Sequence, residues 1–137
     1  MLHPAMTLNR LDAERLQRLI DEMDEIDDRC LTGVLQGKLD LGIVFDPQEL
    51  PASVVSMNTR IRLTDPNDGR STTRTLVFPH SLGSIRDGLS VFTDLGADLL
   101  GRCLGDCVTW PRVDGCRQTL RIDAILWQPE ASGQFHR

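Results

Sequence analysis

The chain has 137 residues, of which 40% are hydrophobic and 26% are charged, and its formal net charge is −5. This composition is typical of a globular domain with its own core and excludes an intrinsically disordered chain. No apolar run is long enough to span a bilayer, and the first ten residues lack the apolar segment of a secretory signal. We therefore expect a cytoplasmic protein that does not bind membranes.

The negative charge is concentrated in the first third of the chain. Residues 10–50 carry 5 basic and 11 acidic side chains, whereas residues 51–137 are close to neutral. Because phosphate contacts need a basic surface, this balance disfavours independent binding to nucleic acid.

Two helices are predicted within residues 8–45. Asn9 can cap the first helix, with Asp12 three residues later in the manner of a capping box. Apolar residues then recur at helical spacing: Leu11, Leu16, Leu19, Ile20 and Met23. The second helix runs roughly over residues 27–41 and contains glycines that weaken it, so it should depend on packing against the first. We expect an antiparallel hairpin over residues 1–46, with a linker at the prolines Pro47 and Pro51.

Acidic residues cluster at the tip of this predicted hairpin. The segment DEMDEIDD spans residues 21–28, and its candidate tip residues are Asp21, Asp24, Glu25, Asp27 and Asp28. Carboxylates of this kind could lend one or two ligands to Mg²⁺. A solvated helix end is the simpler interpretation, and we favour it.

After the linker the apolar period changes from 3.6 to 2. Alternation predicts strands over residues 55–63, 72–78, 107–110 and 118–127, with a loop over 80–87. On the last strand, one face is expected to hold Leu120, Ile122, Ala124 and Leu126. Short links between the strands favour an antiparallel sheet, so the fold class is α+β.

A further strand is predicted over residues 89–92, which makes five strands in all. A short helix is predicted between the third and the fourth of them, directly after residue 92. Thr93 or Asp94 can cap the helix, since either side chain can accept a bond from the first turn. Leu95, Leu99 and Leu100 give it an apolar stripe, and Gly101 is a suitable stop.

The cysteines suggest no metal centre. Cys30, Cys103, Cys107 and Cys116 are irregularly spaced and have no histidine nearby. We expect small thiols in place of zinc ligands or disulfides, and we expect no cofactor and no catalytic residue.

The sequence of the segment LSVFTDLGADLLG, followed by GD, resembles the C-terminal signature of the GreA/GreB transcript-cleavage factors. The segments LDAERLQRLI, VVSMNTRIRL, TRTLVFP and LWQPEASGQF are similar to one branch of that family, the regulators of nucleoside diphosphate kinase. The resemblance covers the chain from about Leu8 to Phe135.

This resemblance implies a short N-terminal coiled coil followed by an FKBP-like body over residues 52–137, with an antiparallel five-stranded sheet and one packed helix. It implies binding to RNA polymerase near the secondary channel, in competition with Gre factors and without stimulation of cleavage. The matching polymerase-binding positions are Thr93, Asp94, Leu95, Gly96, Leu99 and Gly101. Asp94 and Asp98 stand where the family has proline and alanine, and both add negative charge.

Three alternatives remain open at this stage. A Gre-like Mg²⁺-dependent cleavage factor would use the acidic tip, but a helix of about 13–15 residues spans only about 20 Å. An FKBP-like prolyl isomerase would need an aromatic pocket, for which the chain offers few aromatic residues. Direct contact with nucleoside diphosphate kinase is the third. We favour a non-enzymatic regulator whose partner is RNA polymerase, with nucleic acid met only through that complex and no obligatory small-molecule ligand.

Four arginines lie on the first two predicted strands and their turn: Arg60, Arg62, Arg70 and Arg74. They could form a basic contact patch for the polymerase or for nucleic acid. A solvated face with intervening aspartates is the interpretation that we favour.

Overall fold

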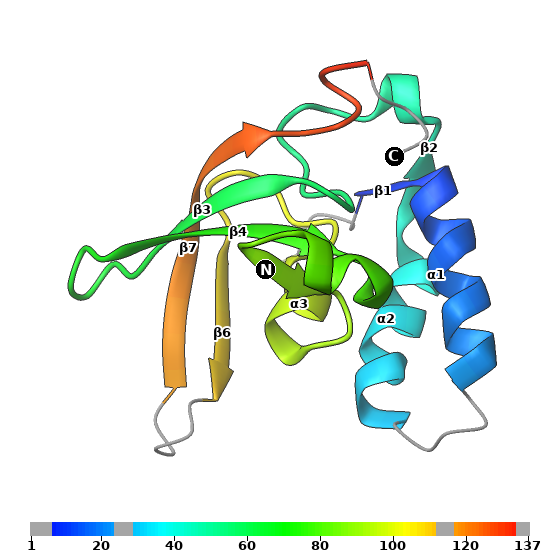
Figure 1. Ribbon diagram of the computed structural model, residues 1–137, viewed down its shortest axis with the longest axis horizontal. Helices are drawn as coiled ribbons and strands as arrows, with labels where there is room; N and C mark the ends of the chain where they lie inside the picture. Colours follow the sequence, from blue (N-terminus) through cyan, green and yellow to red (C-terminus); the bar gives the residue numbers. More distant parts are fainter. Residues whose placement is uncertain (1–6, 24–28, 112–116, 134–137) are drawn as a thin grey trace.

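A computed structural model of the chain describes residues 7–23, 29–111 and 117–133. It has a helical hairpin beside a curled five-stranded sheet, with one short helix between them (Figure 1). This arrangement confirms a mixed α+β fold.

The hairpin consists of α1 (Arg10–Met23) and α2 (Arg29–Leu41). Asn9 caps α1 as predicted, because its Oδ1 accepts a hydrogen bond of 2.8 Å from the backbone N–H of Leu11. The sequence did not predict two flanking strands, β1 (Thr7–Asn9) and β2 (Ile43–Phe45), which pair in parallel at the base of the hairpin. Strands of three residues are too short to show a periodic pattern.

The main sheet has the order β5-β4-β3-β7-β6. Its strands are β3 (Arg60–Thr64), β4 (Ser71–Val77), β5 (Gly88–Ser90), β6 (Cys107–Pro111) and β7 (Arg117–Trp127). The prediction of a wholly antiparallel sheet was wrong, because β4 and β5 pair in parallel. The connection between β4 and β5 contains the 3₁₀ segment η2 (Pro79–Ser84). This connection returns the chain toward the beginning of β4, so that β5 runs in the same direction as β4. A second 3₁₀ segment, η1 (Pro47–Glu49), occupies the predicted linker.

The predicted first strand begins later than its alternation suggested. Val55, Ser56, Met57 and Thr59 are all buried, and β3 starts only at Arg60. Asn58 has φ 64°, in the left-handed region, so the chain turns at this residue and cannot extend. Apolar and polar residues alternate here, but both kinds are buried, so the alternation does not mark a half-buried strand.

The predicted apolar face of the last strand is correct for its first half only. Leu120 and Ile122 are buried, but Leu126 is 47% exposed and Ile125 packs on the core in its place. The register between β3 and β7 skips Asp123 and then Leu126, which are β-bulges. Each bulge inserts one residue and moves the following side chains to the other face of the sheet.

The short helix α3 (Asp94–Leu99) forms as predicted. Thr93 caps it, and Gly101 follows its end with φ 81°. A glycine at this point allows the left-handed conformation that ends a helix.

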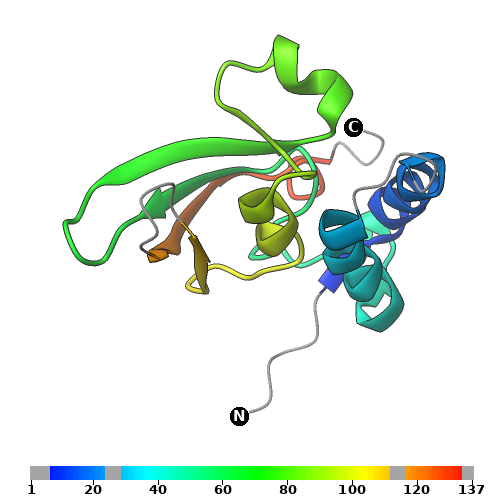
Figure 2. The same ribbon diagram turned by 90° about the horizontal axis from the view of Figure 1, so that it is seen from below.

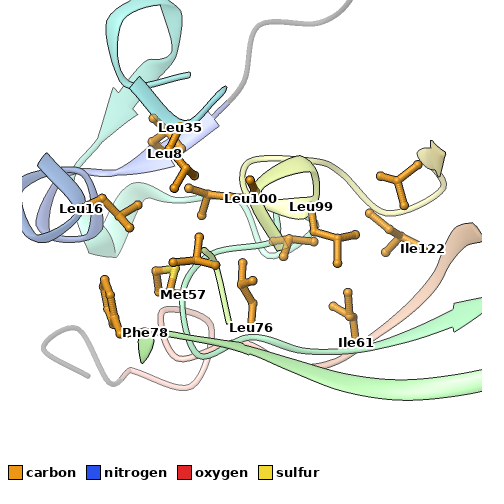
Figure 3. Close-up of a cluster of buried hydrophobic side chains, with 14 of the residues drawn as sticks. Leu8, Leu16, Leu35, Met57, Ile61, Leu76, Phe78, Leu99, Leu100 and Ile122 are labelled. Atoms are coloured by element: carbon orange, nitrogen blue, oxygen red, sulfur yellow. The ribbon is translucent and has the colours of Figure 1, made fainter. Parts of the chain in front are cut away.

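One hydrophobic core joins the hairpin to the sheet (Figure 3). The side chains of Leu8 from β1 and of Leu16 and Leu35 from the hairpin meet those of α3 and of the sheet. Ten of its buried members are labelled in the figure: Leu8, Leu16, Leu35, Met57, Ile61, Leu76, Phe78, Leu99, Leu100 and Ile122. The hairpin is therefore packed directly against the body that carries α3.

The described residues include neither a membrane-spanning helix nor a group of side chains that could bind a metal ion. No helix there is long and apolar enough to cross a bilayer. Within the same ranges, no three His, Cys, Asp or Glu side chains are grouped so that they could hold a metal ion. Cys103 is half-buried and Cys107 is exposed, and both are free thiols.

Candidate functional site

The turn from β5 into α3 has a tightly fixed backbone. The Thr93 hydroxyl donates to the Ser90 carbonyl at 2.7 Å and accepts from the Gly96 N–H at 3.0 Å. A Cβ atom on Gly96 would lie only 2.1 Å from the Ser90 carbonyl oxygen. Glycine is therefore required at this position, because a backbone carbonyl cannot move aside as a flexible side chain can.

The outer part of α3 faces a hollow on the sheet. Leu95 is half-buried and lines a space of about 350 Å³ with residues of β3, β4 and β7, among them Leu63, Arg74 and Leu120. One turn further, half-exposed Asp98 forms an ion pair of 2.7 Å with Arg102. We call the segment Thr93–Arg102 the α3 corner. It offers an apolar residue beside charged ones, as protein-binding surfaces often do.

The predicted polymerase-binding residues divide into two groups in the structure. Thr93 and Leu95 are half-buried and reach the surface, whereas Gly96, Leu99 and Gly101 are buried. The buried three can shape the corner but do not offer side chains to a partner. Asp94 is the first residue of α3, and its side chain lies outside the described part of the structure.

Lys38 of α2 holds the far end of α3, and sequence reasoning missed it. Its Nζ donates to the backbone carbonyls of Ala97, Asp98 and Leu100, the last two at 2.7 Å. These carbonyls belong to the helix C-terminus, where a cation is favoured. Burial lowers the pKa of Lys38 to about 8, opposed by the charge of Asp98. No local pattern could have indicated contacts some 60 residues away along the chain.

A buried polar cluster ties the base of the hairpin to the body. Glu130, which follows β7, accepts hydrogen bonds from Asn9 Nδ2 and from the Ser56 hydroxyl, the latter at 2.7 Å. Asp12 of α1 accepts from the Met57 backbone N–H at 3.0 Å, so the predicted capping box does not form. Burial raises the pKa of Asp12 to about 7, with a further contribution from the charge of Glu130. We call Asn9, Asp12, Ser56 and Glu130 the junction cluster.

The acidic tip is described only in part. Asp21 is exposed and accepts a bond of 3.0 Å from Gln17 Nε2 on the same helix. Asp24, Glu25, Asp27 and Asp28 lie outside the described residues. With 14 residues, α1 spans about 21 Å at 1.5 Å per residue.

The four arginines do not lie on one face of the sheet: Arg60 and Arg62 share a face, whereas Arg74 stands opposite Ile61 and lines the hollow beside Leu95. Arg62 pairs with Asp123 at 2.9 Å, and Arg60 pairs with Asp87 at 3.2 Å. Arg70 lies 4.0 Å from Asp68. The hydrogen bond from Arg62 also lowers the pKa of Asp123. The face that carries Arg60 and Arg62 is a surface with paired charges, and the four arginines together form no single patch.

Comparison with protein families places residues 50–126 in the family described as "Transcription elongation factor, GreA/GreB, C-term". Among curated proteins, the chain is 34% identical over 135 residues to the "Regulator of nucleoside diphosphate kinase" of Escherichia coli strain K12, covering 98% of both chains. The protein of the same name from Shigella flexneri matches equally well.

Solved structures give the same result. The chain resembles the "Prokaryotic transcription elongation factor GreA/GreB from Nitrosomonas europaea" with a TM-score of 0.78 and 30% identity. That match covers 91% of this chain and 100% of the other. The transcription factor Gfh1 matches with a TM-score of 0.51 and 19% identity over 92% of this chain and 100% of its own, which is a likeness of fold alone.

Proposed function

The chain belongs to the GreA/GreB family of transcription elongation factors, and on this premise we propose that it is a non-enzymatic regulator that binds RNA polymerase. The proposed binding surface is the α3 corner, with Leu95 as its apolar contact. Binding would place the helical hairpin at the mouth of the polymerase secondary channel, where it would exclude Gre factors.

The observation that carries this proposal is the double anchoring of the α3 corner. Gly96 and Thr93 fix its entry from β5, and Lys38 fixes its end from the hairpin. A rigid surface loses little conformational entropy on binding, which favours affinity. The same lysine also sets the orientation of the hairpin relative to the corner, so that docking one element positions the other.

The length of the hairpin supports regulation without cleavage. At about 21 Å, α1 is about half as long as the reach that a deep active site would require. We therefore propose that the acidic tip is a solvated end that stays outside the reaction. An Mg²⁺-dependent cleavage role for Asp21 is the alternative, and it predicts transcript shortening that an Asp21→Asn variant would abolish.

We also propose two finer structural assignments. The hairpin would count as a short coiled coil, supported by the paired side-chain amides of Gln17 and Gln36 at 2.8 Å between α1 and α2. The sheet with α3 would be an FKBP-like body beginning near residue 52, close to the first residue of the family match. Neither assignment implies isomerase activity, because fold alone carries no chemistry.

The name of the curated relatives refers to nucleoside diphosphate kinase. Direct contact with that enzyme is a separate candidate, and binding to the purified kinase would test it. We propose an indirect relation through transcription, because it needs no surface beyond the α3 corner.

The test of the proposed function is co-purification with core RNA polymerase. We expect the immobilised chain to retain polymerase, and we expect Asp94→Arg and Leu95→Ala to reduce retention about tenfold. Glu49→Arg is the matched control for charge, because Glu49 is exposed and belongs to η1, not to the α3 corner. Thermal melting of each variant shows whether it is folded. Unchanged retention by folded Asp94→Arg and Leu95→Ala variants would remove the α3 corner from the account.

A further inference from the structure

A second hollow lies on another side of the molecule, between the hairpin and the body. It has a volume of about 700 Å³, within the usual range for small-molecule sites. In Figure 2, η2 projects from the sheet as a separate helical segment, and this segment forms one wall of the hollow. The other wall is α1. The described lining comes from α1, from the turn at Asn58 and from the segment that runs from Phe78 through η2 to Ile85.

The formal charges among the described lining residues of this hollow are positive, whereas the net charge of the chain is negative. Arg15 and Arg18 stand three residues apart and therefore on one side of α1, and His80 of η2 lines the same hollow. No carboxylate is among its described lining residues, although the net charge of the chain is −5. Arg15 also lies near Asp12 of the junction cluster, whereas Arg18 is exposed at the rim. Cationic groups gathered in an acidic protein indicate an anionic ligand.

The remaining lining suits a ring. Phe78 forms a buried apolar wall, and the His80 ring stacks on it with centroids 5.8 Å apart and planes within 10°. Leu19 and Ile85 extend the apolar wall, while Ser81 and Ser84 supply hydroxyl groups. Small-molecule sites commonly combine apolar walls with a few convergent polar groups in this way.

The backbone at one edge of the hollow is in an uncommon conformation. Asn58 has φ 64° and still lines the space, and its N–H is held by the Leu76 carbonyl. Asparagine adopts this conformation more readily than most residues other than glycine, so Asn58 allows a sharp turn of the backbone at the edge of the hollow.

We propose that the hollow between α1 and η2 binds a nucleoside phosphate, with its phosphates on Arg15 and Arg18 and its ring against Ile85 and the exposed His80 ring that stacks on buried Phe78. Because the lining comes from both the hairpin and the body, the bound ligand would fix the hairpin relative to the sheet. The hydrophobic core already joins the hairpin to the sheet without a ligand. The ligand is therefore not needed to hold the fold together, and its role would be regulatory.

Isothermal titration calorimetry on the full chain tests this proposal with three probes: ADP, inorganic pyrophosphate and adenosine. We expect ADP to bind one per chain, pyrophosphate to bind at least tenfold more weakly, and adenosine to give no measurable heat. Arg18→Glu should weaken ADP binding at least tenfold. Arg74→Glu is the matched control, because Arg74 is exposed, carries the same charge change and lies on β4 outside this hollow.

Several outcomes would overturn the proposal. Absence of ADP binding would do so, and so would ADP binding that Arg18→Glu leaves unchanged. Equal affinity for pyrophosphate and ADP would show an anion site without a ring site. Tighter binding of a short RNA than of ADP, with the same dependence on Arg18, would assign the hollow to a nucleic acid strand. None of these measurements needs RNA polymerase, so their failure leaves the proposed docking function intact.

Discussion

The hairpin end of the molecule and the outer face of the sheet, which carries Arg60 and Arg62, are held by different kinds of interaction. At the hairpin end, buried polar groups from distant parts of the chain bond to one another, as Glu130 does with Asn9 and Ser56. At the outer face, charges pair across exposed strands, as Arg62 does with Asp123. Buried polar groups are expensive to leave without partners, whereas exposed ion pairs contribute little to stability. The hairpin end therefore fixes the geometry of the molecule, and the ion pairs of the outer face contribute little to its stability.

The largest effect is expected where the backbone is closest, at Gly96. Gly96→Ala places a Cβ atom 2.1 Å from the Ser90 carbonyl oxygen, so β5 and α3 must separate. We expect the free energy of unfolding to fall by at least about 4 kcal/mol, measured by urea denaturation. Gly83→Ala is the control, because nothing lies within 4 Å of its added Cβ. Equal stability of the two variants would show that the corner is not tightly packed.

The junction cluster predicts a pH dependence. Asp12 has a folded-state pKa of about 7 against 3.8 for the unfolded chain, so the folded state holds its proton more tightly. Its stabilising contribution is complete below about pH 4 and is lost as the pH rises through about 7. One pKa unit is about 1.4 kcal/mol, so we expect a loss of about 2 to 3 kcal/mol after partial relaxation.

Urea denaturation of the wild type and Asp12→Asn at pH 4.5, 6 and 8 measures this loss. The amide keeps an acceptor for the Met57 N–H and does not titrate. The difference in free energy of unfolding, wild type minus variant, should therefore decrease toward pH 8. Parallel pH profiles would contradict the assigned shift.

Removing the hydrogen bonds from Lys38 to α3 should have a smaller effect on the free energy of unfolding. Lys38→Met keeps the apolar stem but loses the three bonds to the carbonyls of α3. We expect a destabilisation of about 2 kcal/mol, together with weaker retention of polymerase. Arg62→Gln on the outer face serves for comparison and should barely change the urea midpoint. If Arg62→Gln destabilised as much as Lys38→Met, the contrast between the two ends would fail.

The smallest expected effect is a gain in stability. Gly37 lies inside α2 with open space around its Cβ direction. Gly37→Ala should stabilise the chain by about 1 kcal/mol, because alanine has the higher helix propensity. The same substitution thus has opposite signs at Gly37 and Gly96. A loss of stability at Gly37 would mean that α2 needs flexibility at this point.

Local chemistry made much of the fold predictable. The caps at Asn9 and Thr93 and the stop at Gly101 involve neighbours within a few residues, and each formed as expected. Alternation located most of the strands, and the signature around α3 identified the family. The bulges at Asp123 and Leu126 were not predictable, because the partner strand determines them and no local pattern marks them.

The candidate site was predictable only in its position along the chain. The residues of the α3 corner were named from sequence, but the burial of Leu99 and Gly101 depends on the packing of the whole molecule. Lys38 and Glu130 were missed because their partners lie some 60 and 121 residues away. Polar side chains with distant partners look like ordinary surface residues in a sequence.

The most direct test uses backtracked elongation complexes with Mg²⁺, to which the chain is added alone or together with a cleavage-competent Gre factor. Transcript shortening is measured over time. We expect no shortening by the chain alone, and we expect excess chain to slow the shortening by the Gre factor. The Asp94→Arg variant should lose this inhibition. Shortening by the chain alone, abolished by Asp21→Asn, would contradict the account, and so would a Gre factor unaffected by saturating chain.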